Sequence, residues 1–391
     1  MYLPDYEGNS ILNLMSSLSS GFGVRNEYPQ HKSLTAKEVR RYKNVILLVI
    51  DGLGHTILNR YGGRSIFSSY LRSPMTSVFP STTASAITTF GTGLAPIEHG
   101  VTGWHMFLRE IGCIITPLRH TIRTQSIEIE ETKADAVLGK RSFSEKLMEL
   151  KGNRCYTIMP ASIIDSVFSR QIRGNSIPKG YNTLRGMFSQ IRSAVRQSRR
   201  SKKKNYIYSY WPELDHLAHL YGTSSVHTYS HLLEICEECM LLIEYLKGKD
   251  TLLIITADHG LIERDKIIDL RQHPQLKDCL TLPLCGEARM SYCYVRLAKK
   301  KQFEAYMKKN LIRYCTAYKT EDLLKRGWFG SPSRSSLHPE FFYRTGDYVI
   351  VMKKNHVMID PLGCEDYARA LYADHGGVSE DEMLVPLIVA G

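Results

Sequence analysis

The sequence predicts an α/β fold, a doubly wound and mostly parallel sheet flanked by helices, with a small α+β insertion. Three short, continuous apolar runs are bounded by polar or turn residues, as is typical of strands buried in a parallel sheet. Helical patterns occupy the intervals, at residues 144–150, 184–195 and 227–246. Strands that alternate with helices in this way indicate a doubly wound sheet.

Each predicted strand leads into an acidic residue. The strands and the acids that follow them are 45–50 (VILLVI) with Asp51, 206–210 (YIYSY) with Asp215, and 251–257 (TLLIITA) with Asp258. In an open α/β sheet, functional groups gather just beyond the carboxyl ends of the strands. The sequence therefore predicts a functional site at this edge of the sheet.

The pattern of predicted secondary structure changes near residue 289. Short strand patterns at 292–295 and 348–352 are separated by basic helical segments. We therefore expect a small α+β insertion at 289–352, carried by a core domain made of residues 1–288 and 353–391.

The composition fits a globular protein without a membrane span. Of the 391 residues, 43% are hydrophobic and 23% charged, and no apolar run approaches the length that crosses a bilayer. The first residues carry Asp5 and Glu7 where a signal peptide would be positive. Nine scattered cysteines suit reduced thiols. Cys236 and Cys239 form a C-x-x-C without a second pair, so we read them as part of a helix. These features predict a cytoplasmic location.

The formal net charge is +12, and the excess is clustered. The basic clusters are Arg199, Arg200, Lys202, Lys203 and Lys204, and then Lys299, Lys300 and Lys301. Such clusters could attract nucleic acid, but no nucleic-acid-binding motif accompanies them. A solvated surface explains them equally well, so nucleic acid stays an alternative partner.

The acidic and histidine residues form a set suited to two divalent cations. The candidate ligands are Asp51, Asp215, His219, Asp258, His259 and His375. Asp215 and His219 are four residues apart, one helical turn, so both can face one metal. Two cations about 4 Å apart can stabilise both the attacking and the leaving oxygen of a phosphoryl transfer. His216, His227 and His231 are nearby histidines that we do not assign as ligands.

A nucleophile is expected at the start of a helix in residues 79–93 (FPSTTASAITTFGTG). Pro80 and the hydroxyl run Ser81, Thr82 and Thr83 are typical of a helix N-terminus. A hydroxyl there lies near free backbone N–H groups and the positive end of the helix dipole, which favour a phosphoryl group. The residues alone leave all three hydroxyls open.

The order of these motifs resembles the alkaline phosphatase superfamily, in particular its type I phosphodiesterase and nucleotide pyrophosphatase branch. The shared order is Asp-Gly after the first strand, a Ser/Thr helix start leading to T-G-L-x-P-x-x-H-G, D-x-x-x-H, D-H-G and a late H-G-G, from about Asn44 to Gly391. In that superfamily the nucleophile lies nine residues before the Thr of T-G, which selects Thr83 through Thr92. The resemblance further implies one metal on Asp51, Thr83, Asp258 and His259, and another on Asp215, His219 and His375.

The sequence departs from characterised nucleotide pyrophosphatases near His99 and Gly100. An Asn that binds the phosphoryl oxygen follows this pair in those enzymes, whereas none occurs here. Trp104 and His105 fall in this region and are candidate substrate contacts, with a core role for Trp104 as the alternative. The C/S-x-P-x-R motif of sulfatases is absent from the sequence.

These interpretations predict a two-metal-dependent phosphodiesterase or nucleotide pyrophosphatase that acts through a phosphothreonine intermediate. A phosphomonoesterase and a catalytically inactive nucleotide-binding protein are the alternatives. Mixed Asp and His ligands favour zinc, with manganese as the second choice. The expected partner is a small-molecule phosphodiester or nucleotide. The physiological substrate and the oligomeric state stay open.

Overall fold

A computed structural model describes residues 1–61, 66–123, 127–198, 201–363 and 365–391. In these residues seven strands form the central sheet, in the order β2-β18-β9-β1-β8-β6-β7. The strands are β1 Asn44–Ile50, β2 Leu71–Thr76, β6 Asn153–Pro160, β7 Ile177–Tyr181, β8 Lys204–Trp211, β9 Thr251–Thr256 and β18 Leu384–Ala390. Strand β18 is antiparallel to β9 and β2, and the other pairings are parallel. The predicted mostly parallel α/β fold is confirmed.

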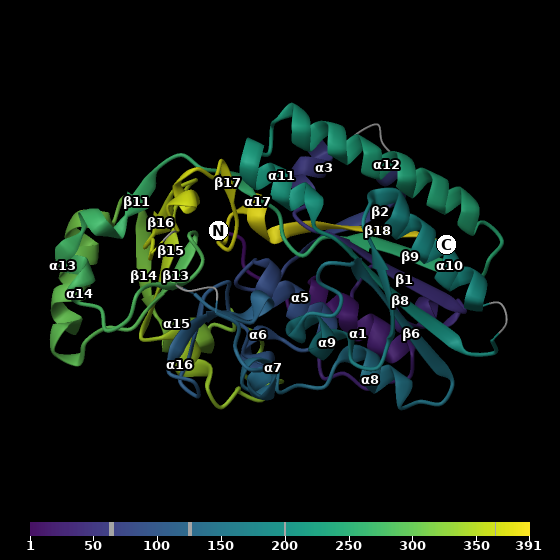
Figure 1. Cartoon of the computed structure of the whole chain (residues 1–391), viewed down its shortest axis with the longest axis horizontal. Helices are drawn as coiled ribbons and strands as arrows, with labels where there is room; N and C mark the ends of the chain where they lie inside the picture. Colours follow the sequence, from purple (N-terminus) through teal and green to yellow (C-terminus); the bar gives the residue numbers. More distant parts are fainter. Residues whose placement is uncertain (62–65, 124–126, 199–200, 364) are drawn as a thin grey trace.

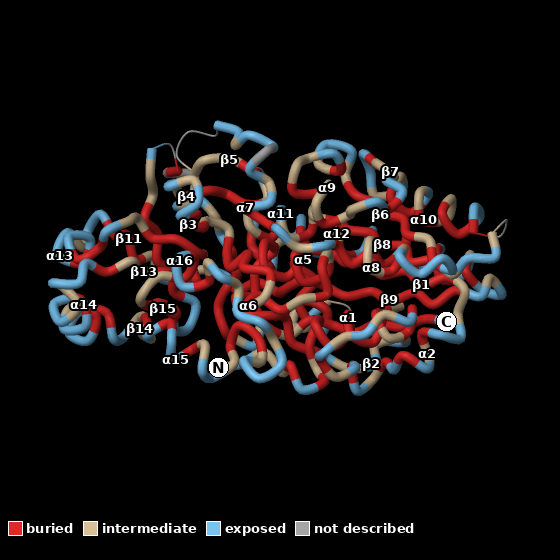
Figure 2. Tube along the Cα trace, turned by 90° about the horizontal axis from the view of Figure 1, so that it is seen from below, coloured by how far each residue is buried: buried red, intermediate tan, exposed pale blue. Residues whose placement is uncertain are grey.

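The three strands predicted from apolar runs lie side by side at the centre of the sheet. Leu47 of β1 pairs with Tyr208 of β8 on one side and with Ile254 of β9 on the other. Every residue of β1 is buried, because both faces of the sheet are covered. Figure 2 shows buried residues concentrated along these strands, whereas exposed residues lie on the loops and helices at the periphery. The parallel register brings the carboxyl ends of β9, β1 and β8 to one edge.

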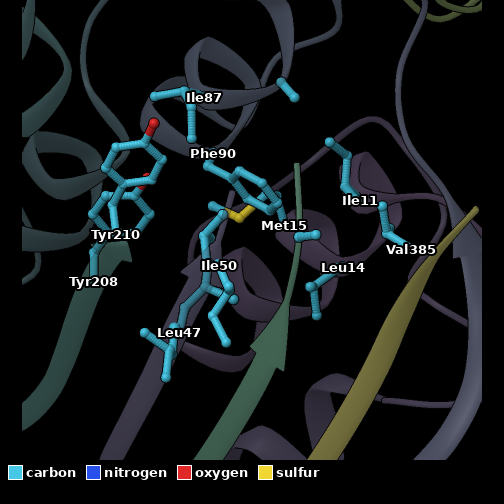
Figure 3. Packing of buried hydrophobic residues seen from close by; sticks show 14 of the residues in the cluster. Ile11, Leu14, Met15, Leu47, Ile50, Ile87, Phe90, Tyr208, Tyr210 and Val385 are labelled. Atoms are coloured by element: carbon cyan, nitrogen blue, oxygen red, sulfur yellow. The ribbon is translucent and has the colours of Figure 1, made fainter. Parts of the chain in front are cut away.

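Helices cover the two faces of the sheet (Figure 1). One layer holds α1 Ile11–Gly21, α5 Thr83–Thr92, α8 Phe143–Met148 and α9 Val167–Arg173, and the other holds α4 Ile66–Tyr70, α10 Leu184–Ser198, α11 Glu213–Tyr221 and α12 Val226–Leu246. Ile87 and Phe90 of α5, Met15 of α1 and the sheet residue Leu47 belong to one hydrophobic cluster (Figure 3). This packing fixes the start of α5 at the same sheet edge as the strand ends.

A second, four-stranded antiparallel sheet lies beside the core, in the order β12-β13-β15-β14. Its strands are β12 Cys285–Gly286, β13 Met290–Cys293, β14 Cys315–Lys319 and β15 Tyr348–Met352. A separate hydrophobic cluster packs on it, with members from Ile268 to Met358. The insertion boundaries of 289–352 therefore remain a proposal, since this cluster draws on residues at both sides of them.

Short elements complete the described chain. The helices are α2 Ala36–Arg40, α3 His55–Tyr61, α6 Pro96–His99, α7 Ala134–Leu138, α13 Pro274–Lys277, α14 Lys300–Tyr306, α15 Thr320–Lys325, α16 Phe341–Thr345 and α17 Glu380–Met383. The strands are β3 Met106–Leu108, β4 Cys113–Thr116, β5 Thr121–Ile122, β10 Ile262–Glu263, β11 Ile267–Asp269, β16 Val357–Ile359 and β17 Ala373–Asp374.

None of the described helices combines the length and the apolar character that a membrane crossing requires. Cys236 and Cys239 lie buried on α12, which confirms the helical segment. Arg199 and Arg200 of the first basic cluster, and Cys364, lie outside the described residues.

Candidate active site

The predicted ligands come together where three adjacent strands end. Asp51 follows β1, Asp258 and His259 follow β9, and Asp215 lies on α11, directly after β8. Since β9, β1 and β8 are neighbours, residues that are far apart in sequence meet at one edge. Strand β17, which pairs with β10 just beyond β9, brings in His375.

One group of possible metal ligands contains Asp51, Asp258 and His259, whose ligand atoms all lie within 4.8 Å of one another. Nε2 of His259 is 3.4 Å from Oδ1 of Asp51 and 3.4 Å from Oδ2 of Asp258. The Tyr210 hydroxyl donates to the other oxygen of Asp51, and the Gly52 N–H donates to the other oxygen of Asp258 at 3.2 Å. The two carboxylate oxygens that face His259 are buried without a hydrogen bond from the described residues. Such oxygens suit a bound cation.

A second group contains Asp215, His259 and His375. The rings of His259 and His375 stack with centroids 3.8 Å apart, and Oδ1 of Asp215 and Nδ1 of His375 are buried without a partner in the described residues. His219 lies outside this group but close to it, with Nε2 3.4 Å from Oδ2 of Asp215. The Nδ1 of His219 lies 2.8 Å from the carbonyl oxygen of Ala373, which orients Nε2 toward Asp215.

Burial makes the metal-free site electrostatically costly. Burial raises the pKa of Asp51 well above its usual value, and the charges of Asp258 and Asp215 raise it further. Burial also lowers the pKa of His375, with further lowering from His259 and His219. Divalent cations would stabilise ionised carboxylates and bind neutral imidazoles, so the donors present fit two such ions. A mixed carboxylate and imidazole set suits zinc or manganese.

The three candidate hydroxyls point in different directions. Thr83 is the first residue of α5, and its Oγ1 lies 3.0 Å from Nε2 of His259. Ser81 donates to the carbonyl oxygen of Gly377 at 2.8 Å, and Thr82 donates to Oε1 of Glu287 at 2.6 Å. Thr83 is thus the member of the run whose hydroxyl contacts the ligand groups.

A cavity of about 420 Å³ opens beside Thr83, and the two candidate substrate contacts, Trp104 and His105, line it. Burial lowers the pKa of His105 well below its usual value, and the nearby guanidinium groups of Arg123 and Arg119 add to this. Arg119 lies over the Trp104 ring, 5.4 Å from its centroid. The remaining wall includes apolar residues, namely Leu284, Met358, Ile359, Pro361 and Leu371.

Two of the three arginines that line the cavity are neutralised by carboxylates. Arg123 pairs with Glu365 at 2.8 Å, and Arg264 pairs with Asp374 at 2.6 Å. Arg119 has no ion pair to a carboxylate in the described part of the chain. Arg119 is therefore the cavity arginine whose charge no described carboxylate offsets.

Sequence reasoning missed several residues of this site, notably Glu287, Tyr210 and the cavity arginines. No motif marks them, because each reaches the site through contacts between distant segments. Of these residues, only Tyr210 could have been found from the sequence, since it ends a predicted strand. Burial raises the pKa of Glu287 to about 8, although hydrogen bonds from Thr82 and Trp104 partly oppose this.

The unassigned histidines have other surroundings. His216 lines the cavity without belonging to either ligand group. His227 stacks on Tyr221 with ring centroids 4.1 Å apart. His231 accepts a hydrogen bond from the Trp211 indole at 2.9 Å.

Residues 45–377 match the family model described as type I phosphodiesterase / nucleotide pyrophosphatase. The chain belongs to this family. The match spans most of the chain and includes every predicted ligand and nucleophile. The family consists of phosphoric ester hydrolases of the alkaline phosphatase superfamily. The chain is therefore such a hydrolase, as the motif order implied. No curated protein sequence matches the chain.

Solved structures share the fold of this family member. Human ectonucleotide pyrophosphatase/phosphodiesterase 5 is 19% identical, with a TM-score of 0.67 over 89% of this chain and 87% of the other. The murine protein is 17% identical, with a TM-score of 0.65 over 88% and 87%. Phosphonoacetate hydrolase from Sinorhizobium meliloti 1021, solved with phosphonoformate, is 16% identical, with a TM-score of 0.60 over 90% of each chain.

Proposed function

We propose that the chain is a two-metal-dependent phosphodiesterase or nucleotide pyrophosphatase that acts through a phosphothreonine intermediate on Thr83. The observation that carries this proposal is the 3.0 Å contact between Oγ1 of Thr83 and Nε2 of His259, the residue common to both ligand groups. Nδ1 of His259 lies 3.1 Å from the carbonyl oxygen of Gly260, which can only accept, so Nδ1 carries the proton. The lone pair of Nε2 is then free for a metal beside Thr83.

We assign the metal ligands to two ions in the way that the family resemblance implies. Asp51, Thr83, Asp258 and His259 would hold one divalent ion, and Asp215, His219 and His375 the other. Two such ions, zinc in the first place and manganese as the alternative, would lower the pKa of the nucleophilic hydroxyl and neutralise charge on the phosphoryl oxygens. Tyr210, Gly52 and Ala373 would orient the ligands from behind.

The reaction then divides into two displacements at phosphorus. Oγ1 of Thr83 attacks in line, the phosphoryl group becomes bonded to threonine, and the bond to the leaving alcohol or phosphate breaks. Water then attacks the phosphothreonine and restores the free hydroxyl. The first N–H groups of α5 would bind a phosphoryl oxygen, since no side chain caps this helix.

The cavity supports a diester or nucleotide substrate over a phosphate monoester. A monoesterase is expected to offer extra unpaired basic groups for the second negative charge of its substrate. Here Arg123 and Arg264 are paired with carboxylates, and the third cavity arginine, Arg119, lies over the Trp104 ring. Trp104 and His105 would contact the group attached to the phosphate. A threonine-to-alanine form of the murine relative, solved in complex with AMP, is inactive.

The test compares bis(p-nitrophenyl) phosphate with p-nitrophenyl phosphate on protein loaded with zinc or manganese. We expect a higher kcat/KM for the diester. A strong monoester preference would instead support the phosphomonoesterase. Absence of turnover on both esters, with AMP binding retained, would support the inactive nucleotide-binding protein. We also propose that the protein is cytoplasmic and that its substrates are small molecules rather than nucleic acids.

A further inference from the structure

Glu287 joins three segments of the active site that are distant in sequence. Its Oε1 accepts a hydrogen bond from the Thr82 hydroxyl at 2.6 Å and another from the Trp104 backbone N–H at 2.6 Å. Glu287 also lines the cavity beside Thr83. One carboxyl oxygen therefore ties the residue before the nucleophile to the loop that carries Trp104.

The backbone around Glu287 is held closely on both sides. His105 and Gly286 exchange two backbone hydrogen bonds, at 3.2 Å and 2.7 Å. A Cβ atom on Gly103 would lie 2.8 Å from the Cα of Gly286. Gly376, next to the candidate ligand His375, has φ +110, and a Cβ there would lie 2.7 Å from the Cβ of Glu287. These contacts hold the backbone and the Cβ of Glu287 in place beside Gly103, His105 and Gly376.

Thr82 occupies the N-cap position of α5 but does not act as a cap. Its backbone is extended, with φ −136 and ψ 150, as expected for an N-cap residue. A threonine in this position normally accepts a hydrogen bond from an N–H of the first helical turn. In α5 no side-chain cap is formed, because the Thr82 side chain is turned toward Glu287, to which its hydroxyl donates. The N–H groups of the first turn therefore have no side-chain cap, and Thr83 of this turn lines the cavity.

We propose that Glu287 is a positioning residue, which holds the Thr82 hydroxyl away from the capping position and so keeps the N-terminal N–H groups of α5 available to the phosphoryl group. The same hydrogen bonds fix the Trp104 loop relative to Thr83. This inference rests on the proposed nucleophilic role of Thr83. Glu287 acts through Thr82 and the helix, and it needs no proton transfer of its own.

The experiment measures kcat, KM and metal content of the zinc-loaded protein with bis(p-nitrophenyl) phosphate. We expect Glu287→Ala to lower kcat about 10- to 100-fold while KM changes less than about 3-fold and metal content is kept, since the lost contacts act in the transition state. Glu287→Gln should keep kcat within about 3-fold, because its amide oxygen can accept both hydrogen bonds.

Substitution of Thr82 provides a second test of the proposed role of Glu287. In Glu287→Ala the Thr82 hydroxyl is free to cap the helix, so Thr82→Val added to that variant should restore part of kcat. A matched control is Thr88→Val, which removes a hydroxyl that donates to the Ala84 carbonyl oxygen at 2.6 Å in the same helix. This control should stay within about 2-fold of the parent.

Inhibition by orthovanadate, an analogue of the phosphoryl transition state, gives an independent readout. Its Ki should rise in Glu287→Ala in parallel with the loss of kcat, and in Glu287→Gln it should stay near that of the parent. If the parent is active and Glu287→Ala is fully active as well, this inference alone is overturned. A parent without turnover, or an active Thr83→Ala, would overturn the proposed function instead.

Discussion

The hydroxyl oxygen of Thr83 lies 3.0 Å from Nε2 of His259, although 176 residues separate them in the chain. His259 belongs to both groups of candidate ligands, so this contact brings the proposed nucleophile next to the residue that the two groups share. The start of α5 and the end of β9 create the contact, because both lie at the carboxyl edge of the central sheet.

Thr83→Ala should lower kcat by on the order of 10³-fold or more, since it removes the oxygen that we propose as the acceptor of the phosphoryl group. Metal content, measured by plasma mass spectrometry, should stay near that of the parent because the aspartate and histidine ligands remain. Ser81→Ala, which removes a hydroxyl bonded to Gly377, serves as the comparison and should lose far less activity. Equal losses in the two variants would contradict the choice of Thr83.

Each ligand replacement should weaken binding of one metal ion. His259→Ala should reduce binding of the ion proposed on Asp51, Thr83 and Asp258, because Nε2 of His259 offers a single lone pair. Asp215→Asn should reduce binding of the other ion, so the double variant should lose both. Metal equivalents per chain after dialysis provide the measurement. His216→Ala, which changes another histidine of α11 that lines the cavity, should keep both equivalents. A metal loss in this control would count against the assignment.

Glu287→Gln should make the metal-free protein progressively more stable than the parent as the pH rises. Burial raises the pKa of Glu287 from 4.5 to about 8. A raised pKa means that the stabilising contribution of this group is complete below pH 4.5 and is lost as the pH rises through about 8. Glutamine does not ionise, so the Tm difference between variant and parent should grow from pH 4.5 to 8 and then level off. A difference that is constant with pH would show that Glu287 does not titrate in this range.

Trp104→Ala should raise KM for a nucleotide ester about 10-fold, the size expected when one base loses its aromatic stacking partner. The kcat should change much less, because Trp104 lies in the cavity wall and outside the ligand groups. Trp104→Phe keeps an aromatic face and should stay near the parent. Steady-state kinetics with thymidine 5′-(p-nitrophenyl phosphate) measure both constants. An unchanged KM in Trp104→Ala would favour a purely structural role.

Arg289→Ala should destabilise the protein by about 3–5 kcal/mol, the cost of leaving one partner of a buried ion pair alone. Arg289 forms two hydrogen bonds of 2.9 Å with Glu382, and both side chains are buried. Urea denaturation at a fixed metal concentration measures the change. Arg141→Ala breaks an exposed pair with Glu149 and should cost less than about 1 kcal/mol. Similar values for both variants would contradict the buried character of the first pair.

The local sequence predicted the central part of the fold well. The apolar runs at 45–50, 206–210 and 251–257 are β1, β8 and β9, because a strand buried on both faces needs apolar side chains on both. The acidic residues after these strands lie together, as expected when parallel strands end at one edge. The domain boundaries were harder to predict from the sequence, since the second hydrophobic cluster is assembled from Ile268, Met358 and segments between them.

By itself, the sequence determined the strands, the helix that begins near Ser81 and the types of ligand at the sheet edge, because periodicity and residue type are local properties. It left three hydroxyls open and gave no sign of Glu287. Only the tertiary structure separated Thr83, which faces His259, from Thr82, which donates to Glu287 205 residues away. The direction of a side chain depends on partners that the fold brings close, and those partners are set by packing between distant segments.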